Sequence, residues 1–189
     1  MHTEPGKLGC VANPNWILRT ARLVLTPVGG ADLADLRAIK ADPRVFAIML
    51  GGVRSPEQTA RELAEDVVAW SKHGFGMWAI REGAGATFVG TAGLQRRSDS
   101  RGIALRFALW PEAQGRGLAR EAAGATLRFG HEQARLRRIV AVARESNFAS
   151  RMILGGIGMV ERASFLQLGW RMVMYESVIL PAPPAGASR

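Results

Sequence analysis

Hydrophobic residues recur along the chain with two periods, and the order of these periods predicts a mixed α/β domain. Residues 22–28 alternate between apolar and polar side chains and are rich in β-branched residues, which favours a strand. By the same signals, strands are predicted over residues 22–28, 75–80, 87–94, 103–109, 138–143, 160–167 and 172–180. Apolar residues three or four positions apart predict helices over residues 32–40, 55–72, 117–135 and 147–154. The sequence shows no internal repeat that would indicate a solenoid.

The second predicted helix has the clearest start in the chain. Ser55 is a capping residue, a proline follows it directly, and Gln58 lies three residues after the cap, which is the pattern of a capping box. Leu63, Val67 and Trp70 then recur at helical spacing. We therefore expect these three side chains to form the buried face of the helix.

The composition is that of one globular domain. Of the 189 residues 48% are hydrophobic and 22% charged, and a domain of this length buries roughly 70% of its unfolded surface. Cys10 is the one cysteine, so no internal disulfide is available and a reducing, cytoplasmic setting is expected. No apolar run approaches the ~20 residues of a membrane-spanning helix, and the first ten residues lack the apolar stretch of a signal peptide. We expect a single domain over residues 16–180, with flexible ends at 1–15 and 181–189.

Positive charge is concentrated in one part of the sequence. The chain carries 25 lysines and arginines against 16 aspartates and glutamates, a net charge of +9. Residues 95–151 hold twelve arginines and five acidic residues, and so account for seven of these nine charges. Unless it reflects genomic base composition, such an excess indicates a polyanionic partner, either nucleic acid or a small ligand with several phosphates. The sequence lacks zinc-ligand spacings, RNA-binding aromatic signatures and basic arms, which disfavours nucleic acid.

A glycine-containing turn between a predicted strand and a predicted helix is the most informative stretch of the chain. Gly115 and Gly117 allow the backbone to turn tightly and to approach a ligand closely. The first amides of the helix that follows have no internal acceptor, and the helix dipole adds partial positive charge there, so this end can bind phosphate. Arg116 and Arg120 add full charges. On spacing alone, a purely structural turn would use the two glycines equally well.

Two common nucleotide-binding motifs are excluded at this turn. No Gly-Lys-Ser or Gly-Lys-Thr follows it, as the phosphate loop of nucleotide hydrolases requires. Its neighbouring elements also do not form the parallel βαβ unit of dinucleotide-binding domains. Nucleotide hydrolysis and hydride transfer are therefore disfavoured.

Four segments of the chain occur in an order that is typical of one enzyme family. They are residues 20–25, 88–94, 114–119, which read Gln-Gly-Arg-Gly-Leu-Ala, and 145–151, the last followed by Gly158 and Met159. Together they resemble the GNAT N-acetyltransferases, in the branch of the ribosomal-protein N-terminal (RimJ/RimL-type) acetyltransferases. The turn matches the family's Gln/Arg-x-x-Gly-x-Gly/Ala signature through Gln114, Gly117 and Ala119.

The resemblance implies a fold of the α/β class, the GNAT fold. This fold has a central mixed, mostly antiparallel sheet of six to seven strands, flanked by four helices. A V-shaped splay is expected between the fourth and fifth predicted strands, residues 103–109 and 138–143. That splay opens the slot in which the donor molecule lies.

The resemblance also implies acetyl coenzyme A (acetyl-CoA) as the co-substrate. It places the diphosphate on the turn, the pantetheine arm along the strand before the turn, and two further contacts on the far side. The implied cofactor-binding residues are Phe107, Ala108, Leu109, Gln114, Gly115, Arg116, Gly117, Leu118, Ala119, Asn147 and Ser150. No metal is expected, because no cluster of metal-ligating residues competes with this site. Coenzyme A is a small polyanion, which accounts for part of the local basic excess.

Acetyl transfer requires a neutral amine near the thioester, donors for the developing oxyanion and a proton source for the leaving thiolate. A backbone amide near Leu109 is the candidate for the oxyanion contact, and Ser150 is the candidate to reach the thiol. Glu112 is a weaker catalytic candidate, for steering the amine through water, with Glu145 and Glu176 as alternates.

Two positions depart from the pattern of the family. Members of this branch commonly carry a glutamate base and a tyrosine acid at positions that Ala104 and Leu154 occupy here. We therefore expect an acceptor that reacts without a dedicated base, such as an α-amino group with a pKa of about 8. A lysine side chain, with a pKa of about 10.4, would need more help.

The expected function is transfer of an acetyl group from acetyl-CoA to a primary amine, by direct attack in a ternary complex. The acceptor is either a protein N-terminal α-amine or a small molecule, and dimers are common in this branch, so a homodimer is a further expectation. The absence of both the glutamate base and the tyrosine acid favours an alternative, a catalytically weak domain that binds or senses acyl-CoA. A third interpretation, an RNA- or ribosome-associated domain, uses the arginine-rich surface. A membrane partner is not expected.

Overall fold

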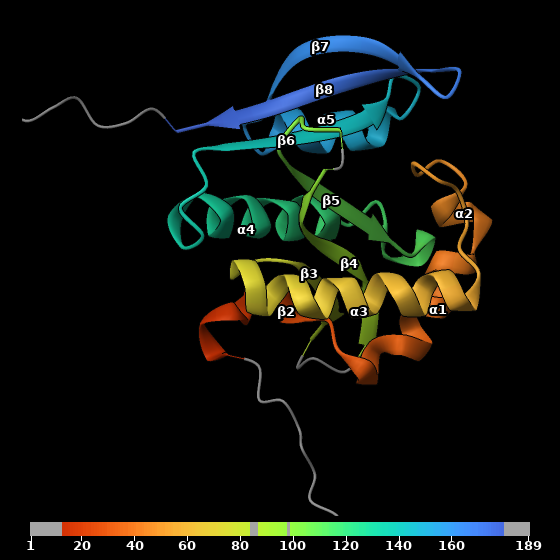
Figure 1. The fold of residues 1–189 in the computed structure, drawn as a ribbon, viewed down its shortest axis with the longest axis vertical. Helices are drawn as coiled ribbons and strands as arrows, with labels where there is room; N and C mark the ends of the chain where they lie inside the picture. Colours follow the sequence, from red (N-terminus) through yellow and green to blue (C-terminus); the bar gives the residue numbers. More distant parts are fainter. Residues whose placement is uncertain (1–12, 84–86, 98, 180–189) are drawn as a thin grey trace, which may run out of the picture.

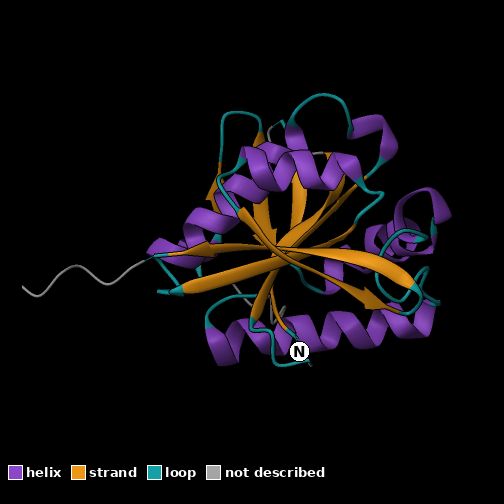
Figure 2. Cartoon of the chain, turned by 90° about the horizontal axis from the view of Figure 1, so that it is seen from above, coloured by secondary structure: helices purple, strands orange, loops and turns teal. Residues whose placement is uncertain are grey.

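The computed structural model of the protein describes residues 13–83, 87–97 and 99–179, which form one sheet covered by helices on both faces (Figures 1 and 2). The described strands are β1 (Leu18–Arg19), β2 (Leu23–Pro27), β3 (Met77–Glu82), β4 (Thr87–Arg96), β5 (Ile103–Leu109), β6 (Arg138–Arg144), β7 (Val160–Gln167) and β8 (Trp170–Val178). They form an eight-stranded sheet in the order β1-β2-β3-β4-β5-β6-β8-β7. Neighbouring strands are antiparallel, except β5 and β6, which are parallel.

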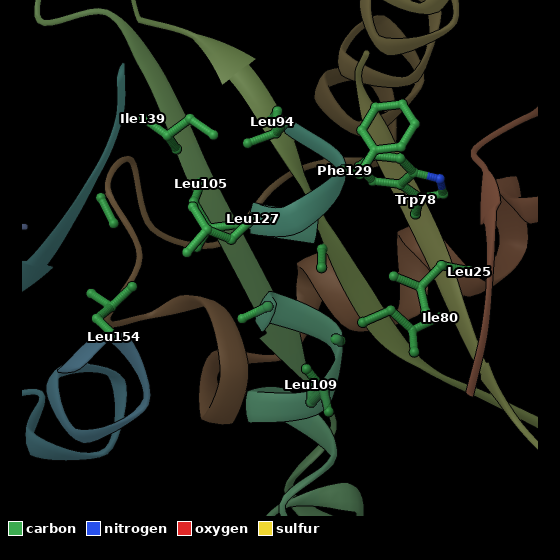
Figure 3. Close-up of a cluster of buried hydrophobic side chains, with 14 of the residues drawn as sticks. Leu25, Trp78, Ile80, Leu94, Leu105, Leu109, Leu127, Phe129, Ile139 and Leu154 are labelled. Carbon is green, nitrogen blue, oxygen red and sulfur yellow. The ribbon is translucent and has the colours of Figure 1, made fainter. Parts of the chain in front are cut away.

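Helices pack on both faces of the sheet and contribute to more than one core cluster. The described helices are α1 (Leu33–Ala41), α2 (Pro43–Phe46), α3 (Pro56–His73), α4 (Leu118–Glu132) and α5 (Phe148–Gly156), with 3-10 turns at Pro14–Trp16, Gly30–Asp32 and Pro111–Ala113. α1 and α3 cover one face of the sheet, in a cluster that contains Leu36, Leu63 and Ala79. α4 covers the other face, where its Leu127 belongs to one core cluster with Leu105 of β5 (Figure 3).

The predicted mixed α/β fold is confirmed, with small differences in the number of elements. The described residues form eight strands and five α-helices, against the six to seven strands and four helices that the sequence predicts. β1 is a two-residue strand defined by its pairing with β2. α2 is a single turn, which begins where Asp42 Oδ1 accepts a hydrogen bond from the Arg44 backbone N–H at 2.8 Å. Elements this short show no periodicity, so tertiary pairing and capping define them.

The predicted splay lies between β5 and β6, which are the fourth and fifth predicted strands. These two strands pair only at Ile103↔Ile139 and Ala104↔Val140. On its other side, β5 pairs with β4 along its whole length, from Ile103 to Leu109. The second half of β5 therefore presents unpaired backbone towards β6, and a V-shaped opening separates the two strands.

The buried face of α3 differs from the predicted one by one residue. Ser55 and Gln58 form the predicted capping box, and Leu63 and Trp70 are buried as expected. The Val67 side chain, however, is 45% exposed, and Asp66 takes its place on the buried face with only 6% exposed. The prediction for Val67 is wrong because both 66 and 67 lie near this face by helical spacing, and hydrophobicity alone favours valine.

The two ends of the chain are described only in part. Of the predicted flexible ends, residues 1–12 and 181–189 lie outside the described residues, and Cys10 lies outside them too. Residues 14–16 form a 3-10 turn, capped by the Asn13 side chain. In the part of the chain that the structure describes, no helix has the length and apolar character needed to span a membrane.

Candidate functional site

β5 leads into the glycine-containing turn, and α4 leads out of it. Gly115 and Gly117 have φ values of 71° and 78°, in the left-handed region that favours glycine. Gly117 is the N-cap of α4 and has no side chain to accept from the first amides of the helix. The Gln114 side-chain amide donates to the Leu109 carbonyl at 3.1 Å, which ties the turn to the end of β5. The turn therefore presents backbone N–H groups and the positive end of a fifteen-residue helix to an anion.

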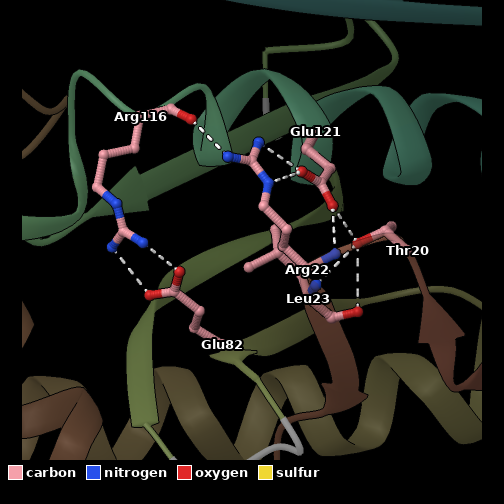
Figure 4. Close-up of polar contacts among 6 residues, drawn as sticks. All are labelled: Thr20, Arg22, Leu23, Glu82, Arg116 and Glu121. Carbon is pink, nitrogen blue, oxygen red and sulfur yellow. Dashed lines mark hydrogen bonds and ion pairs between the residues drawn. The ribbon is translucent and has the colours of Figure 1, made fainter.

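A polar network holds this turn against the first strands (Figure 4). Glu121, in the first turn of α4, accepts from Thr20 Oγ1 at 2.6 Å and from the Arg22 backbone N–H at 3.0 Å. Burial alone would raise the pKa of Glu121, but the hydrogen bonds from Thr20 and Arg22 outweigh burial and lower it. Arg22 Nη1 also donates to the Arg116 carbonyl oxygen at 2.7 Å. The Arg116 guanidinium pairs with Glu82 on β3, which raises the pKa of Arg116.

The splay between β5 and β6 contains a cavity of about 320 Å³. β5, β6, the end of β4, the start of α5 and the segment between α2 and α3 contribute to its walls. Of the predicted cofactor-binding residues, Phe107, Asn147 and Ser150 line it. Ala104 and Leu154, the two positions that depart from the family pattern, line it as well. The glycine turn itself lies outside this lining, beyond the end of β5.

Asn147 and Ser150 stand together at the start of α5. Asn147 is the N-cap of this helix, and its Oδ1 accepts from the Ser150 backbone N–H at 3.1 Å. This capping bond gives Asn147 a structural role independent of any ligand. The Ser150 hydroxyl makes no hydrogen bond with another described residue and belongs to the cavity wall.

The three glutamates proposed from the sequence do not line the cavity. The Glu112 side chain is 68% exposed and pairs with Arg44 at 3.1 Å. Glu145 lies 3.7 Å from an arginine of β8, and Glu176 pairs with Arg138. The fold thus uses these carboxylates in ion pairs on other parts of the surface.

A smaller cavity of about 40 Å³ adjoins the first, on the α1 and α3 face of the sheet. The two cavities share the lining residues Met49, Gln95, Arg106 and Phe107. Arg106, on β5, stands between them, and its Nη1 donates to Gln95 Oε1 at 2.6 Å. Burial lowers the pKa of Arg106, and no described carboxylate forms an ion pair with it.

Charged side chains gather around the smaller cavity. Glu62 accepts from Lys40 Nζ at 2.7 Å and from Arg54 Nε at 2.6 Å. Burial would raise the pKa of Glu62, but these two hydrogen bonds outweigh it, so the pKa is lowered. Asp66 also lines this cavity, and its carboxylate accepts no hydrogen bond from any described residue. Burial raises the pKa of Asp66 to about 6, although Lys40 and Arg106 partly oppose this.

Sequence reasoning misses Asp66 and Arg106. Both interrupt apolar patterns: Asp66 lies three residues after Leu63 and four before Trp70, on the buried stripe of α3. Arg106 lies in the middle of an otherwise apolar strand. A charged residue at a core position is the signal that could have pointed to them.

Comparison with known proteins decides the family. Residues 22–160, most of the chain, match the family model described as an acetyltransferase (GNAT) domain. The chain belongs to the GNAT acetyltransferases. The predicted family and enzyme class are thereby confirmed, and enzymes of this family use acetyl-CoA. Among the described residues of this acetyltransferase, no group of three or more His, Cys, Asp or Glu side chains is arranged to hold a metal ion.

Solved structures of GNAT proteins resemble the fold of this acetyltransferase. An acetyltransferase from Agrobacterium tumefaciens str. C58 is 26% identical, with a TM-score of 0.75 over 85% of this chain and 93% of that one. A GNAT-family protein from Bordetella pertussis is 25% identical, with a TM-score of 0.75 over 85% and 98% of the two chains. RimL, a ribosomal L7/L12 alpha-N-protein acetyltransferase solved with coenzyme A, is 17% identical, with a TM-score of 0.71 over 86% and 98%. These likenesses show that this chain shares the fold of those proteins.

Proposed function

We propose that the protein transfers the acetyl group of acetyl-CoA to a primary amine, by direct attack of the amine within a ternary complex. The observation that carries this proposal is the parting of β5 and β6 over a cavity of about 320 Å³, next to a helix N-terminus that can bind phosphate. This arrangement gives one long ligand two attachment points, one for its phosphates and one for its reactive end. Membership of the GNAT family supports the same chemistry.

The residues around the turn fit the diphosphate of acetyl-CoA. The backbone N–H groups at residues 115–119 would hold it, because Gly117 leaves the first amides of α4 without a side-chain acceptor. Arg116 would add charge after exchanging its Glu82 partner for a phosphate. The backbone of Phe107, Ala108 and Leu109, in the part of β5 that does not pair with β6, would hold the pantetheine arm. Asn147 and Ser150, which line the cavity, would contact it from the opposite wall.

Two groups of the chain would act on the reacting atoms. A backbone N–H near Leu109 would donate to the oxygen of the tetrahedral intermediate. The Ser150 hydroxyl, which lines the cavity, would deliver a proton to the leaving thiolate. Glu112 receives no support for a catalytic role, since it is exposed and paired with Arg44.

The acceptor is proposed to be an α-amino group, of a protein N-terminus or of a small molecule. Its pKa of about 8 leaves a useful neutral fraction at physiological pH, whereas a lysine side chain near 10.4 does not. RimL, whose fold this chain shares, is a ribosomal L7/L12 alpha-N-protein acetyltransferase, which supports testing protein N-termini first. A cytoplasmic location and a homodimer belong to the same proposal, and light scattering of the purified chain tests the dimer.

One assay tests the proposed function against its alternative. The full chain is incubated with acetyl-CoA and a panel of peptides and small amines, and free thiol is followed. We expect free thiol to form in the presence of α-amines, and none to form when the acceptor amine is left out. Tight binding of acetyl-CoA without turnover of any amine would instead identify a domain that senses acyl-CoA. This alternative is favoured by Ala104 and Leu154 in the cavity wall, because neither side chain can exchange a proton. A strict preference for lysine side chains would contradict the proposed acceptor.

A further inference from the structure

Asp66 is a buried carboxylate without a hydrogen-bond partner among the described residues. Its side chain projects from α3 towards β5 and lines the smaller cavity, and only 6% of the residue is exposed. A buried ionisable group that lacks a partner destabilises a fold unless water or a ligand satisfies it. The 40 Å³ cavity is large enough for at least one water molecule beside this carboxylate.

The charges around Asp66 leave it free to exchange a proton. Lys40 of α1 faces it, but its ammonium donates to Glu62 at 2.7 Å. Arg106 of β5 faces it from the sheet and donates to Gln95. Glu62 and Glu65, on α3 itself, oppose its ionisation. Glu62 is held ionised by two cations, so Asp66 is the carboxyl in this cluster that can titrate near neutral pH.

The smaller cavity, which Asp66 lines, adjoins the larger one, where acetyl transfer would occur. Gln95, Arg106 and Phe107 line both cavities, so they form the boundary between Asp66 and the splay. Phe107 is also a proposed contact of the pantetheine arm. A water in the smaller cavity can therefore lie between the carboxylate and an amine that enters the larger one.

Resting on the proposed function, we propose that Asp66 is the proton acceptor of the reaction, acting through a water molecule in the smaller cavity. The acceptor enters as an ammonium ion and gives one proton through that water to the Asp66 carboxylate. The neutral amine nitrogen then forms the bond to the acetyl carbon, and the carbon–sulfur bond breaks. The second proton of the nitrogen passes to the thiolate, while Asp66 releases its own to solvent. The sum is an amide, a free thiol and one proton.

This assignment resolves the absence of a base on β5. A general base is most effective when its pKa lies near the working pH, and a carboxyl raised to about 6 meets this condition better than an exposed one. Ala104, at the position where the family often has glutamate, has no ionisable group and cannot act as a base. The base is thus supplied from α3, across the face of the sheet.

The pH dependence of kcat/KM tests the proposal, with acetyl-CoA saturating and an α-amine peptide from the thiol assay as acceptor. The wild-type chain should keep its activity down to a pH near 6. In Asp66→Asn only the free amine reacts, so the fall in activity should move up to a pH of about 8. At pH 7 about one tenth of an amine with a pKa of about 8 is neutral, so the variant should lose about 10-fold in kcat/KM, and at pH 9 much less. Asp66→Glu, which keeps a carboxyl group, should restore the activity between about pH 6 and pH 8.

Glu65→Gln is the matched control. Glu65 is the neighbouring carboxylate on α3, is exposed, and lines neither cavity. Its charge adds to the rise in the pKa of Asp66, so its loss should leave the fall in activity near pH 6 or move it slightly lower, and never up to pH 8. A merely structural role of Asp66 would lower activity equally at every pH, with no shift of the profile. That outcome would overturn the proposal.

A second measurement does not depend on turnover. The pKa of Asp66 is followed by carbon NMR of the labelled carboxyl, in the free chain and after addition of coenzyme A with the dipeptide Ser-Ala. We expect the pKa to move by at least half a unit when the larger cavity fills. An unchanged pKa, with coenzyme A bound, would overturn the role of Asp66 and leave the acetyltransferase function standing. Failure to bind coenzyme A at all would contradict the proposed function and, with it, this inference.

Discussion

The proton chemistry of Asp66 affects stability as well as catalysis. Burial raises its pKa from 3.8 to about 6, so the folded protein binds this proton more tightly than the unfolded chain does. The free energy of unfolding therefore falls as pH rises from about 4 to about 6, and the full cost persists above that range. A shift of this size corresponds to at most about 3 kcal/mol. A carboxylate that costs stability is typical of a residue kept for function.

Asp66→Asn should stabilise the protein at pH 8. Removing a buried ionised carboxyl removes its desolvation cost, so we expect the midpoint of chemical unfolding to rise relative to the wild type at pH 8 and the difference to vanish near pH 4. Urea unfolding monitored by circular dichroism at both pH values checks this. A variant that is less stable at pH 8 would show that ion attraction to Lys40 and Arg106 outweighs burial.

The backbone conformation of Gly117 shapes the turn that is proposed to bind phosphate. Its φ of 78° suits glycine, and a β-branched side chain there is strained by about 1–3 kcal/mol. Gly117→Val should therefore weaken binding of acetyl-CoA at least tenfold by calorimetry, because the first amides of α4 are displaced. Gly124→Ala, in the middle of the same helix, is the control, since an added Cβ meets its neighbours at 3.6 Å or more. Equal affinity of Gly117→Val and wild type would refute the site at the turn.

At the scale of elements, the junction between β5 and α4 is held by contacts from the N-terminal strands. Glu121 binds Thr20 and Arg22, and Arg22 reaches the carbonyl of Arg116 (Figure 4). The match to the family model begins at residue 22, the arginine of this network. The network fixes the backbone of the turn before any ligand arrives, which lowers the ordering cost of binding.

Glu82→Gln tests whether Arg116 takes part in phosphate binding. Glu82 holds the guanidinium of Arg116 in the structure, and an ion pair at the surface such as this one is weak enough to exchange for a phosphate. Freeing Arg116 should tighten binding of acetyl-CoA by about two- to fivefold, measured by calorimetry at low salt. Glu132→Gln, an exposed carboxylate at the far end of α4, should have no effect. Unchanged affinity in Glu82→Gln would show that the backbone of the turn binds phosphate without Arg116.

At the scale of the whole molecule, the fold redistributes the charge that the sequence concentrates in residues 95–151. Several arginines of this stretch pair with carboxylates that lie outside it: Arg116 with Glu82, Arg138 with Glu176 and Arg151 with Glu161. Arg106 lies inside, between the two cavities. The local excess is therefore not a continuous stripe of unpaired arginines, as a nucleic-acid surface would require.

We accordingly expect no specific binding of RNA. In a filter-binding assay at 0.15 M salt, a ribosomal RNA fragment should show no saturable binding, while the same preparation binds acetyl-CoA. Binding to RNA with a steep dependence on salt concentration would contradict this and support a ribosome-associated role.

Regular elements and the turn were predictable from the sequence because their signals are local. The apolar run in β5, the capping box of α3 and the glycines before α4 each reflect constraints within about ten residues. β1 and α2 escaped prediction because they are too short for a period. Val67 was mistaken for a core residue because spacing cannot separate two adjacent positions at the edge of a helix face.

The sequence by itself determined the class of fold, the order of its main elements and the glycine-containing turn proposed to bind phosphate. These features depend on backbone geometry and side-chain periodicity, which involve only residues close together in the chain. Only the tertiary structure decided which charged groups meet. Asp66 and Arg106 are forty residues apart in the chain, yet α3 and β5 bring both to one small cavity. Their burial, and hence the pKa of Asp66, depends on desolvation by distant segments, which no local pattern records.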